Sequence, residues 1–262
     1  MTKPILRFHN ISNDVTAFST TRHGGYSIGN YSEFNINNYC GDSPESTEKN
    51  LTLLCNELGI TKDRLVMPHQ THGTEIRQIA SDFFSLSPST RKLLLEGVDA
   101  VMTDLEEVCI GVSTADCIPV LLYDPEHRVC CAVHAGWRGT VEHIVMKAVK
   151  ALTHVYSTRP ENLTACIGPG ISLESFEVGD EVYEQFAQSG FDTSRVCRRY
   201  EKWHIDLWEC NRIDLLTTGV NPESINVSGI CTYKNVDEFF SARRLGIESG
   251  RIFTGIKINK RL

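Results

Sequence analysis

The stretch from residue 108 to residue 139 reads VCIGVSTADCIPVLLYDPEHRVCCAVHAGWRG and decides the fold. Three runs within it are apolar throughout, as is typical of central strands covered on both faces, and they span 108–112, 119–123 and 129–133. An Asp-Pro-Glu turn separates the second run from the third, which predicts a hairpin. The sequence thus predicts a β-sheet core built around this stretch.

Further strands and helices are predicted on both sides of this core. After Gly139, apolar residues recur at helical spacing as far as Val155 and predict one long amphipathic helix packed on the sheet. An N-cap at Ser43 and a stop at Gly59 predict another helix between them. We expect further strands at 15–21, 163–167, 225–230 and 251–258, and further helices at 180–188 and 207–218. Because strands outnumber helices and no repeat or linker interrupts the chain, we predict an α+β fold. It would form one domain over residues 1–262, with mixed central β-sheets flanked by helices.

The composition is that of an ordinary globular protein. Of the 262 residues, 41% are apolar and 23% are charged, which excludes a disordered chain. The net charge of −7 would repel a phosphate backbone, and the sequence contains no basic patch, so we expect no nucleic-acid partner. No signal peptide and no apolar run of roughly 18 residues is visible, so we expect a cytoplasmic protein without a membrane partner.

Ten cysteines are many for a chain of this length. A cytoplasmic chain keeps its thiols reduced, and a chain this long does not need disulfides to fold, so we expect none. Five cysteines lie inside apolar runs, where cysteine behaves as a small hydrophobic residue, and we expect them in the core: Cys55, Cys109, Cys130, Cys131 and Cys166. Cys117 differs, because it lies in the segment STADC between two apolar runs.

Cys117 and His134 are the first candidates for a functional site. His134 ends the third apolar run, and a hairpin of the predicted length can bring it close to Cys117 at one edge of the sheet. A thiolate and an imidazole at strand ends form either a nucleophilic pair or two ligands of a metal ion. We also expect a helix to start at Gly139, so that an anion-binding N-terminus lies near His134.

His72 is the third candidate, in a loop segment that reads MPHQTHGT over residues 67–74. The separations between the three candidates are long, unlike the short Cys-x-x-Cys spacing of structural zinc modules. One cysteine and two histidines from distant segments fit a catalytic zinc, whose fourth position is open to water or substrate. Two alternatives remain. One is a metal-free hydrolase or amidase with Cys117 as nucleophile and His134 as base, and the other is a binding protein that uses the metal to hold its fold.

Motifs spread over nearly the whole chain are similar to those of a known family. The most specific are Thr114-Ala115-Asp116-Cys117 and His134-Ala135-Gly136-Trp137-Arg138-Gly139. The others include Arg22-x-Gly24-Gly25, Asn35, Gly41-Asp42, His69-Gln70-Thr71-His72-Gly73, Asp99-Ala100, Ile167-Gly168-Pro169, Cys231-Thr232 and Phe240-Ser241-x-Arg243-Arg244. On these motifs the chain resembles the laccase-domain or polyphenol-oxidase-like family. That family is also described as zinc-dependent purine nucleoside phosphorylases, related in fold to the cytotoxic-necrotizing-factor-like cysteine hydrolases.

The resemblance implies that His72, Cys117 and His134 form the catalytic centre and are the ligands of one zinc ion. It implies phosphorolysis of adenosine, inosine, guanosine and S-methyl-5′-thioadenosine, together with adenosine deamination, so the partners would be a purine nucleoside and phosphate. Oxidation of phenols would need a redox metal, and a copper-dependent polyphenol oxidase is a further alternative. Family members often carry cysteines just before Glu177-Val178-Gly179; this chain has none there, which weakens a multi-copper interpretation. We expect a monomer or a weak homodimer.

Several polar residues of these motifs are candidates for binding the substrates or orienting the ligands. Phosphate needs cations and backbone N–H groups. The candidates for substrate or phosphate binding are Arg22, Asn35, Arg138, Arg243 and Arg244. His69 and Asp116 are candidates for orienting the metal ligands. Trp137 could stack on a purine or pack in the core.

Overall fold

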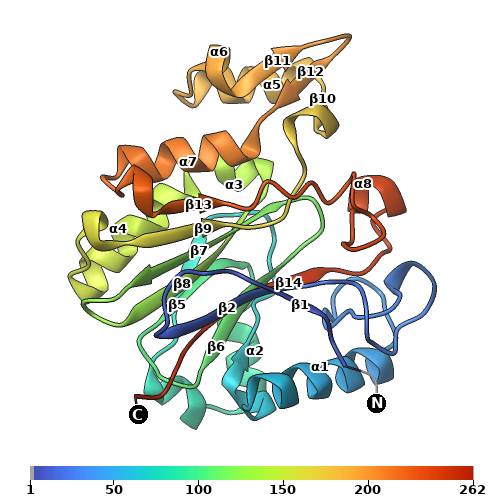
Figure 1. The fold of residues 1–262 in the computed structure, drawn as a ribbon, viewed down its shortest axis with the longest axis vertical. Helices are drawn as coiled ribbons and strands as arrows, with labels where there is room; N and C mark the ends of the chain where they lie inside the picture. The colour runs from blue at the N-terminus through green and yellow to red at the C-terminus, as the bar shows by residue number, and fades with distance from the viewer. Residues whose placement is uncertain (1–2, 262) are drawn as a thin grey trace.

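Two β-sheets form the centre of the computed structural model, which describes residues 3–261 (Figure 1). The six-stranded sheet consists, in spatial order, of β13 (Ile225–Val227), β9 (Thr164–Ile167), β7 (Ile118–Asp124), β8 (Val129–Ala135), β5 (Val98–Thr103) and β4 (Glu75–Gln78). The five-stranded sheet consists of β1 (Leu6–Phe8), β2 (Val15–Thr20), β14 (Ile252–Ile258), β6 (Cys109–Thr114) and β3 (Leu65–Val66). Each sheet contains both parallel and antiparallel pairs, so the predicted α+β fold with mixed sheets is confirmed.

The three apolar runs that opened the sequence analysis are β6, β7 and β8, and every residue of these strands is buried. β7 and β8 form the predicted antiparallel hairpin, with Pro119 opposite His134. β6 lies in the other sheet, so residues 115–117 cross from one sheet to the other. Asp116 lies within this crossing and has a φ of 85°, in the left-handed region that aspartate tolerates better than most residues. Cys117 therefore lies at the junction of the two sheets.

The burial of both faces explains why these strands carry no alternating pattern. On β7, Leu121 and Tyr123 belong to the apolar cluster shared with the five-stranded sheet. Val120 and Leu122 belong to the cluster formed with the helix α4 (Ile144–Tyr156). Full burial of one such aliphatic side chain contributes about 1.5–3 kcal/mol to folding, so apolar residues are favoured on both faces of the strand.

The long helix predicted after Gly139 is two helices, α3 (Trp137–Val141) and α4. The break lies at His143, whose φ of 56° interrupts the helical backbone. Two tertiary hydrogen bonds hold His143 there, from its Nδ1 to Asp214 Oδ1 at 2.8 Å and from its Nε2 to the Ser189 carbonyl at 2.9 Å. The predicted helix start was also wrong, because Gly136 caps α3 and Gly139 lies inside it.

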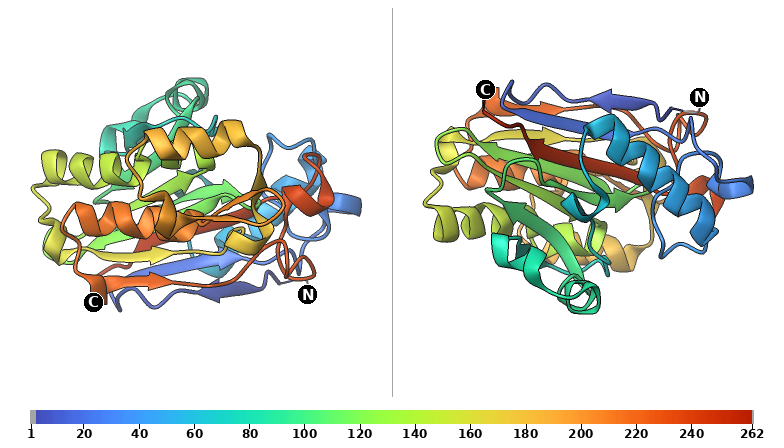
Figure 2. Two further views of the ribbon diagram at one scale, coloured as in Figure 1. Left: turned by 90° about the horizontal axis from the view of Figure 1, so that it is seen from above. Right: turned by 90° about the horizontal axis from the view of Figure 1, so that it is seen from below.

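The other helices flank the sheets, as the views from above and below show (Figure 2). α1 (Pro44–Leu58) ends at Gly59 with a φ of 65°, as predicted, and α5 (Asp180–Gln188) and α7 (Leu207–Thr217) are also confirmed. Short elements without a periodic signal were missed: α2 (Pro88–Leu94), α6 (Thr193–Val196), α8 (Ala242–Leu245), β4 and the small sheet of β10 (Glu177–Val178), β12 (Trp203–Ile205) and β11 (Cys197–Arg199). This small sheet projects from the body together with α5 and α6 (Figure 1).

The five cysteines predicted to pack in the core are all buried, which confirms that expectation. Cys40 and Cys117 are the two that retain partial exposure. Within residues 3–261, no helix has both the length and the apolar character that crossing a membrane requires.

Candidate metal centre and adjoining pocket

His72, Cys117 and His134 come together from three separate segments. One ligand atom of each lies within 4.8 Å of the others. His72 is in the loop between β3 and β4, Cys117 is in the crossing from β6 to β7, and His134 is near the end of β8. His72 is exposed, Cys117 is half-buried and His134 is buried, so the cluster opens to solvent on the His72 side. Cys117 and His134 meet because Pro119 pairs with His134 across the β7–β8 hairpin, which places residue 117 at the same end.

A buried carboxylate, Asp99 on β5, positions both histidines. Its Oδ1 accepts a hydrogen bond from His134 Nδ1 at 2.7 Å and from the His72 backbone N–H at 3.1 Å. Its Oδ2 accepts from the backbone N–H groups of Gly73 at 2.8 Å and Thr71 at 3.3 Å. The bond to Nδ1 leaves Nε2 of His134 free to face the cluster. The three backbone bonds hold the loop where His72 has a φ of 62°.

The motifs alone did not indicate this role for Asp99. The signal was available, because β5 is otherwise an apolar strand in which every residue is buried. An ionisable residue in such a strand needs a partner of opposite charge or several hydrogen-bond donors. Burial alone would raise the pKa of Asp99, but hydrogen bonding to His134 and to the backbone of Gly73 and Thr71 outweighs burial and lowers the pKa.

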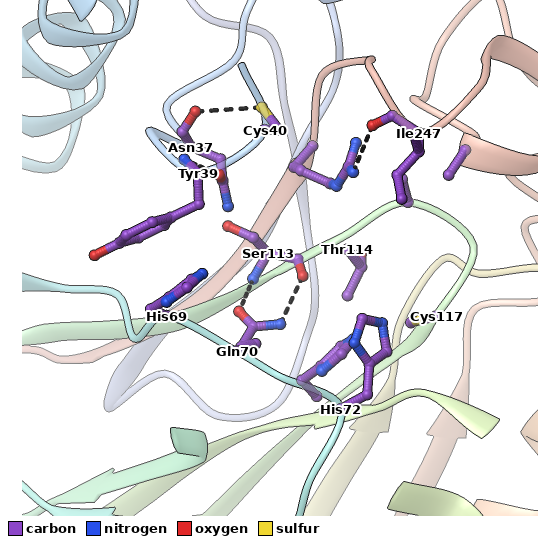
Figure 3. Close-up of a pocket in the computed structure, with 14 residues that line it drawn as sticks. Asn37, Tyr39, Cys40, His69, Gln70, His72, Ser113, Thr114, Cys117 and Ile247 are labelled. Atoms are coloured by element: carbon purple, nitrogen blue, oxygen red, sulfur yellow. Dashed lines mark hydrogen bonds between the residues drawn. The ribbon is translucent and has the colours of Figure 1, made fainter. Parts of the chain in front are cut away.

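Gln70 ties the same loop to the end of β6. Its side-chain oxygen accepts a hydrogen bond from the Ser113 backbone N–H at 2.7 Å, and its side-chain nitrogen donates to the Ser113 carbonyl at 2.8 Å (Figure 3). The amide thus pairs with the strand backbone as a neighbouring strand would. The loop that carries His72 is therefore attached to both sheets, through Asp99 in one and Ser113 in the other.

The cluster favours a thiolate beside a protonated imidazole when no metal is bound. Burial alone would raise the pKa of Cys117, but the positive charge of His134 and hydrogen bonds with His134 and His72 lower the pKa to about 6. Burial alone would lower the pKa of His134, but the Cys117 thiolate and Asp99 raise the pKa to about 9. The thiolate is the form of cysteine that binds a metal or acts as a nucleophile.

Gly136 leaves the space that the three side chains occupy. A Cβ atom at this position would lie 2.9 Å from His72 Cδ2 and 3.2 Å from Cys117 Sγ. It would also lie 3.6 Å from His134 Cε1. No larger residue fits without displacing a member of the cluster, which explains a glycine in the HAGWRG segment.

A pocket of about 310 Å³ adjoins the cluster, and we call it the main pocket (Figure 3). His72, Cys117 and His134 line it together with eleven further residues: Asn37, Tyr39, Cys40, His69, Gln70, Ser113, Thr114, Ala115, Ala242, Ile247 and Arg251. The rings of Tyr39 and His69 stack at the pocket with centroids 4.0 Å apart. The sequence analysis did not predict the 37–40 and 247–251 contributions, because these loops carry no motif of recognisable chemistry.

Two of the predicted substrate residues hold loops together outside the cluster. Arg22 donates from Nε to the Ser32 carbonyl and from Nη1 to the Val236 carbonyl, both at 2.8 Å. Asn35 is fully buried and donates from Nδ2 to Asp42 at 2.8 Å. Neither residue lines the main pocket, and a contact of either with a substrate stays a prediction.

The paired arginines after β13 also point elsewhere. Arg243 donates from Nη1 to the Glu177 carbonyl at 2.8 Å, and Arg244 donates from Nη1 to the Tyr233 carbonyl at 3.1 Å. Both are exposed, and neither lines the main pocket. Arg138 is different, because it lines a second pocket that it shares with His72.

The predicted orienting residues do not touch the ligands' side chains. His69 Nδ1 bonds to Glu96 at 2.7 Å. Asp116 accepts a hydrogen bond from Thr232 Oγ1 and one from the Arg243 backbone N–H, both at 2.7 Å, and so fixes the crossing that carries Cys117. Asp99 does what was predicted for these two residues, and Asp116 acts on Cys117 only through the backbone.

Comparisons with known proteins agree with the motifs. A purine nucleoside phosphorylase of Bacteroides thetaiotaomicron is 47% identical, with 98% of this chain and 97% of that protein covered. Adenosine deaminase RL5, from an unknown prokaryotic organism, is 41% identical, with 92% of this chain and 93% of that protein covered. The crystal structure of the hypothetical protein YfiH of Bacillus licheniformis matches with a TM-score of 0.91 at 27% identity. It covers 98% of this chain and 97% of that chain.

A family model covers almost the whole sequence. The model described as multi-copper polyphenol oxidoreductase laccase matches residues 16–259. The resemblance inferred from the motifs is therefore confirmed. This chain belongs to the multi-copper polyphenol oxidoreductase laccase family, among whose relatives are proteins named as purine nucleoside phosphorylases and as an adenosine deaminase.

Proposed function

We propose that this protein is a zinc-dependent purine nucleoside phosphorylase with adenosine deaminase activity. Its substrates would be phosphate and adenosine, inosine, guanosine or S-methyl-5′-thioadenosine. The observation that carries the proposal is the opening of the His72–Cys117–His134 cluster into a pocket of about 310 Å³, within the range of small-molecule sites. The names of the two relatives supply the two reactions.

The donor set of the cluster fits zinc better than copper. One thiolate and two neutral imidazoles are three of the four ligands of a catalytic zinc site, and the solvent side leaves the fourth position open. Zinc, when bound, supplies a Lewis acid that activates water and polarises a substrate group. A blue-copper site would add an axial methionine to a cysteine and two histidines, and Met67 instead accepts a hydrogen bond from Ser113 Oγ at 3.0 Å.

The residues around the cluster would bind the nucleoside and keep the ligands in one geometry. Asp99 holds the hydrogen of His134 on Nδ1, so that Nε2 is the donor atom. Tyr39 is partly exposed at the main pocket and offers an aromatic face to a planar base. Because β7 and β8 are buried and paired along their length, we expect the thiolate and the imidazole of His134 to need little reorganisation when a substrate binds.

The test is an activity assay with metal analysis on protein purified without added metal. With adenosine and phosphate, phosphorolysis gives adenine and deamination gives inosine. We expect about one zinc per chain and at least one of the two products. A protein that binds zinc but forms neither product would refute the proposal. His72→Ala should lose zinc and activity. The control is His154→Ala, which changes an exposed histidine on α4 and should lose neither.

A metal-free cysteine hydrolase is the second candidate. Cys117 with a pKa near 6, His134 and Asp99 form a nucleophile, a base and an orienting carboxylate, as in cysteine hydrolases. Activity that survives complete removal of metal and disappears on alkylation of Cys117 would establish this candidate. A copper-dependent polyphenol oxidase would instead require copper in the purified protein and oxidation of a phenol.

The proposed setting is the cytoplasm, and the proposed assembly is a monomer or a weak homodimer. A reducing compartment suits a site that depends on a free thiol at Cys117. Sedimentation at several protein concentrations tests the assembly, and a dimer that persists at nanomolar concentration would contradict it.

A further inference from the structure

A second pocket lies beside His72 and is distinct from the main pocket. It measures about 380 Å³, and we call it the side pocket. Thr74, Arg138, Glu142 and Gln185 are among its lining residues. Among the described residues, His72 alone lines both pockets, so the two meet at the exposed member of the candidate metal cluster.

Arg138 is the residue of the side pocket with unused binding capacity. Its guanidinium carbon lies 4.2 Å from the centroid of the Trp137 ring, which limits its freedom. Arg138 is exposed, and among residues 3–261 its guanidinium forms no ion pair and no hydrogen bond with a side chain or a backbone carbonyl. By contrast, the guanidinium groups of Arg22, Arg243 and Arg244 all donate to backbone carbonyls. A guanidinium offers five donors in a fork that matches an oxyanion.

Close packing holds Arg138 near the candidate metal cluster. A Cβ atom at Gly139 would lie 3.1 Å from the Gly73 carbonyl oxygen, so α3 approaches the His72 loop closely, and a larger residue there would need a small shift of the loop. The same loop is fixed on its other side by Asp99. An anion that Arg138 binds in the side pocket is therefore next to His72.

The charges around the side pocket favour the binding of a single anion. Lys147 Nζ donates to Thr74 Oγ1 at 3.0 Å and lies 3.3 Å from a carboxylate oxygen of Glu142. Lys147 thus offsets the carboxylate that would otherwise repel an anion. Arg138, Lys147 and Glu142 together carry one net positive charge.

We infer that the side pocket binds the inorganic phosphate of phosphorolysis through Arg138, while the nucleoside occupies the main pocket. This inference rests on the proposed function. In phosphorolysis a phosphate oxygen forms a bond to C1′ of the ribose as the bond from C1′ to N9 breaks. The electron pair of that bond goes to the purine, which takes up a proton, and the products are ribose 1-phosphate and the free base. In deamination, water supplies the oxygen that replaces the amino group, the amino group leaves as ammonia, and no phosphate is used.

The two reactions therefore respond differently to the loss of Arg138. Loss of a charge-assisted hydrogen-bond partner weakens binding by about 10-fold to 100-fold. For Arg138→Gln we expect the KM for phosphate to rise at least about 10-fold, with deamination of adenosine in phosphate-free buffer within about twofold of wild type. For Glu142→Gln we expect the KM for phosphate to fall by up to about fivefold, because one exposed charge changes binding by at most about fivefold.

Arg199→Gln is the matched control, because Arg199 is an exposed arginine over a tryptophan ring, that of Trp203. It should leave both reactions unchanged. Calorimetric titration of wild type and Arg138→Gln with inorganic phosphate adds a readout that needs no turnover. Unchanged phosphate binding in Arg138→Gln, or an equal fall in both reactions, would overturn the inference. Wild-type protein that binds phosphate through Arg138 but forms neither adenine nor inosine would overturn the proposed function and leave the anion site standing.

Discussion

Replacing Asp99 with asparagine tests whether one carboxylate preorganises the metal cluster. The carboxylate accepts four hydrogen bonds, two on each oxygen. The single oxygen of asparagine can accept the two hydrogen bonds of only one carboxylate oxygen. The NH₂ group of asparagine then faces the two donors that had bonded to the other oxygen. If it keeps His134 and His72, the backbone N–H of Gly73 loses a 2.8 Å partner.

The magnitude follows from these contacts. A buried donor left without a partner costs about 1–3 kcal/mol, and a neutral acceptor weakens the remaining bond from His134 by about a further 1 kcal/mol. We therefore expect Asp99→Asn to lower the free energy of unfolding of the metal-free protein by about 3 kcal/mol. Loss of a residue that orients a ligand typically lowers metal affinity by about 10-fold to 100-fold, and we expect a loss of zinc affinity in this range.

The assay pairs chelator competition for zinc with urea unfolding of the metal-free protein. Asp214→Asn is the control, because Asp214 is also a buried aspartate that accepts a hydrogen bond from a histidine, at 2.8 Å from His143. It should lose stability but keep its zinc affinity within about twofold of wild type, since distant sites act independently. If Asp99→Asn loses stability like this control and binds zinc as tightly as wild type, Asp99 serves the fold and not the ligands.

Three further predictions concern the cluster and the pH dependence of stability. Gly136→Ala places a Cβ 2.9 Å from His72 Cδ2, so the zinc affinity measured by chelator competition should fall at least about 10-fold. An unchanged affinity would mean that the side chains of the cluster can shift to accommodate the methyl group. In metal-free protein at pH 7, iodoacetamide should modify Cys117 first, because its pKa of about 6 makes it a thiolate. Bound zinc should protect Cys117 from this modification. Mass spectrometry that finds another cysteine modified first would contradict the prediction. Burial lowers the pKa of His9 to about 4, so protonation favours the unfolded chain, and stability should be lost as the pH falls from about 6.5 towards 4. This loss is worth about 3 kcal/mol and should be smaller in His9→Gln, as urea unfolding across that pH range will show; equal slopes in both proteins would exclude His9 as its source.

The parts of the site that local sequence determines were predictable. Cys117 and His134 flank one hairpin, and the two apolar runs and their turn were enough to bring the two residues together. His72 could not be placed in this way, because its loop is held by Asp99 and Gln70 through contacts to β5 and β6. Such contacts leave no periodic signal in the sequence.

The roles of the arginines could not be predicted from their motifs. Arg22 and Arg138 both lie in glycine-containing motifs, yet one guanidinium is used by two backbone carbonyls and the other faces a pocket. Which carbonyls lie within reach is decided by tertiary structure. The helix break at His143 has the same origin, since its bonds to Asp214 and the Ser189 carbonyl outweigh the helical propensity of the flanking residues.

The place of β14 between β2 and β6 has a consequence for how the protein folds. The β7–β8 hairpin joins neighbouring residues and can form early, but β2 and β14 pair residues as far apart as Val15 and Ile258. Closing so long a loop is slow, so the five-stranded sheet forms late. β6 leads directly into the crossing that carries Cys117, and Ser113 on β6 anchors the His72 loop. High-affinity zinc capture should therefore be a late event in refolding, after the last strand has inserted.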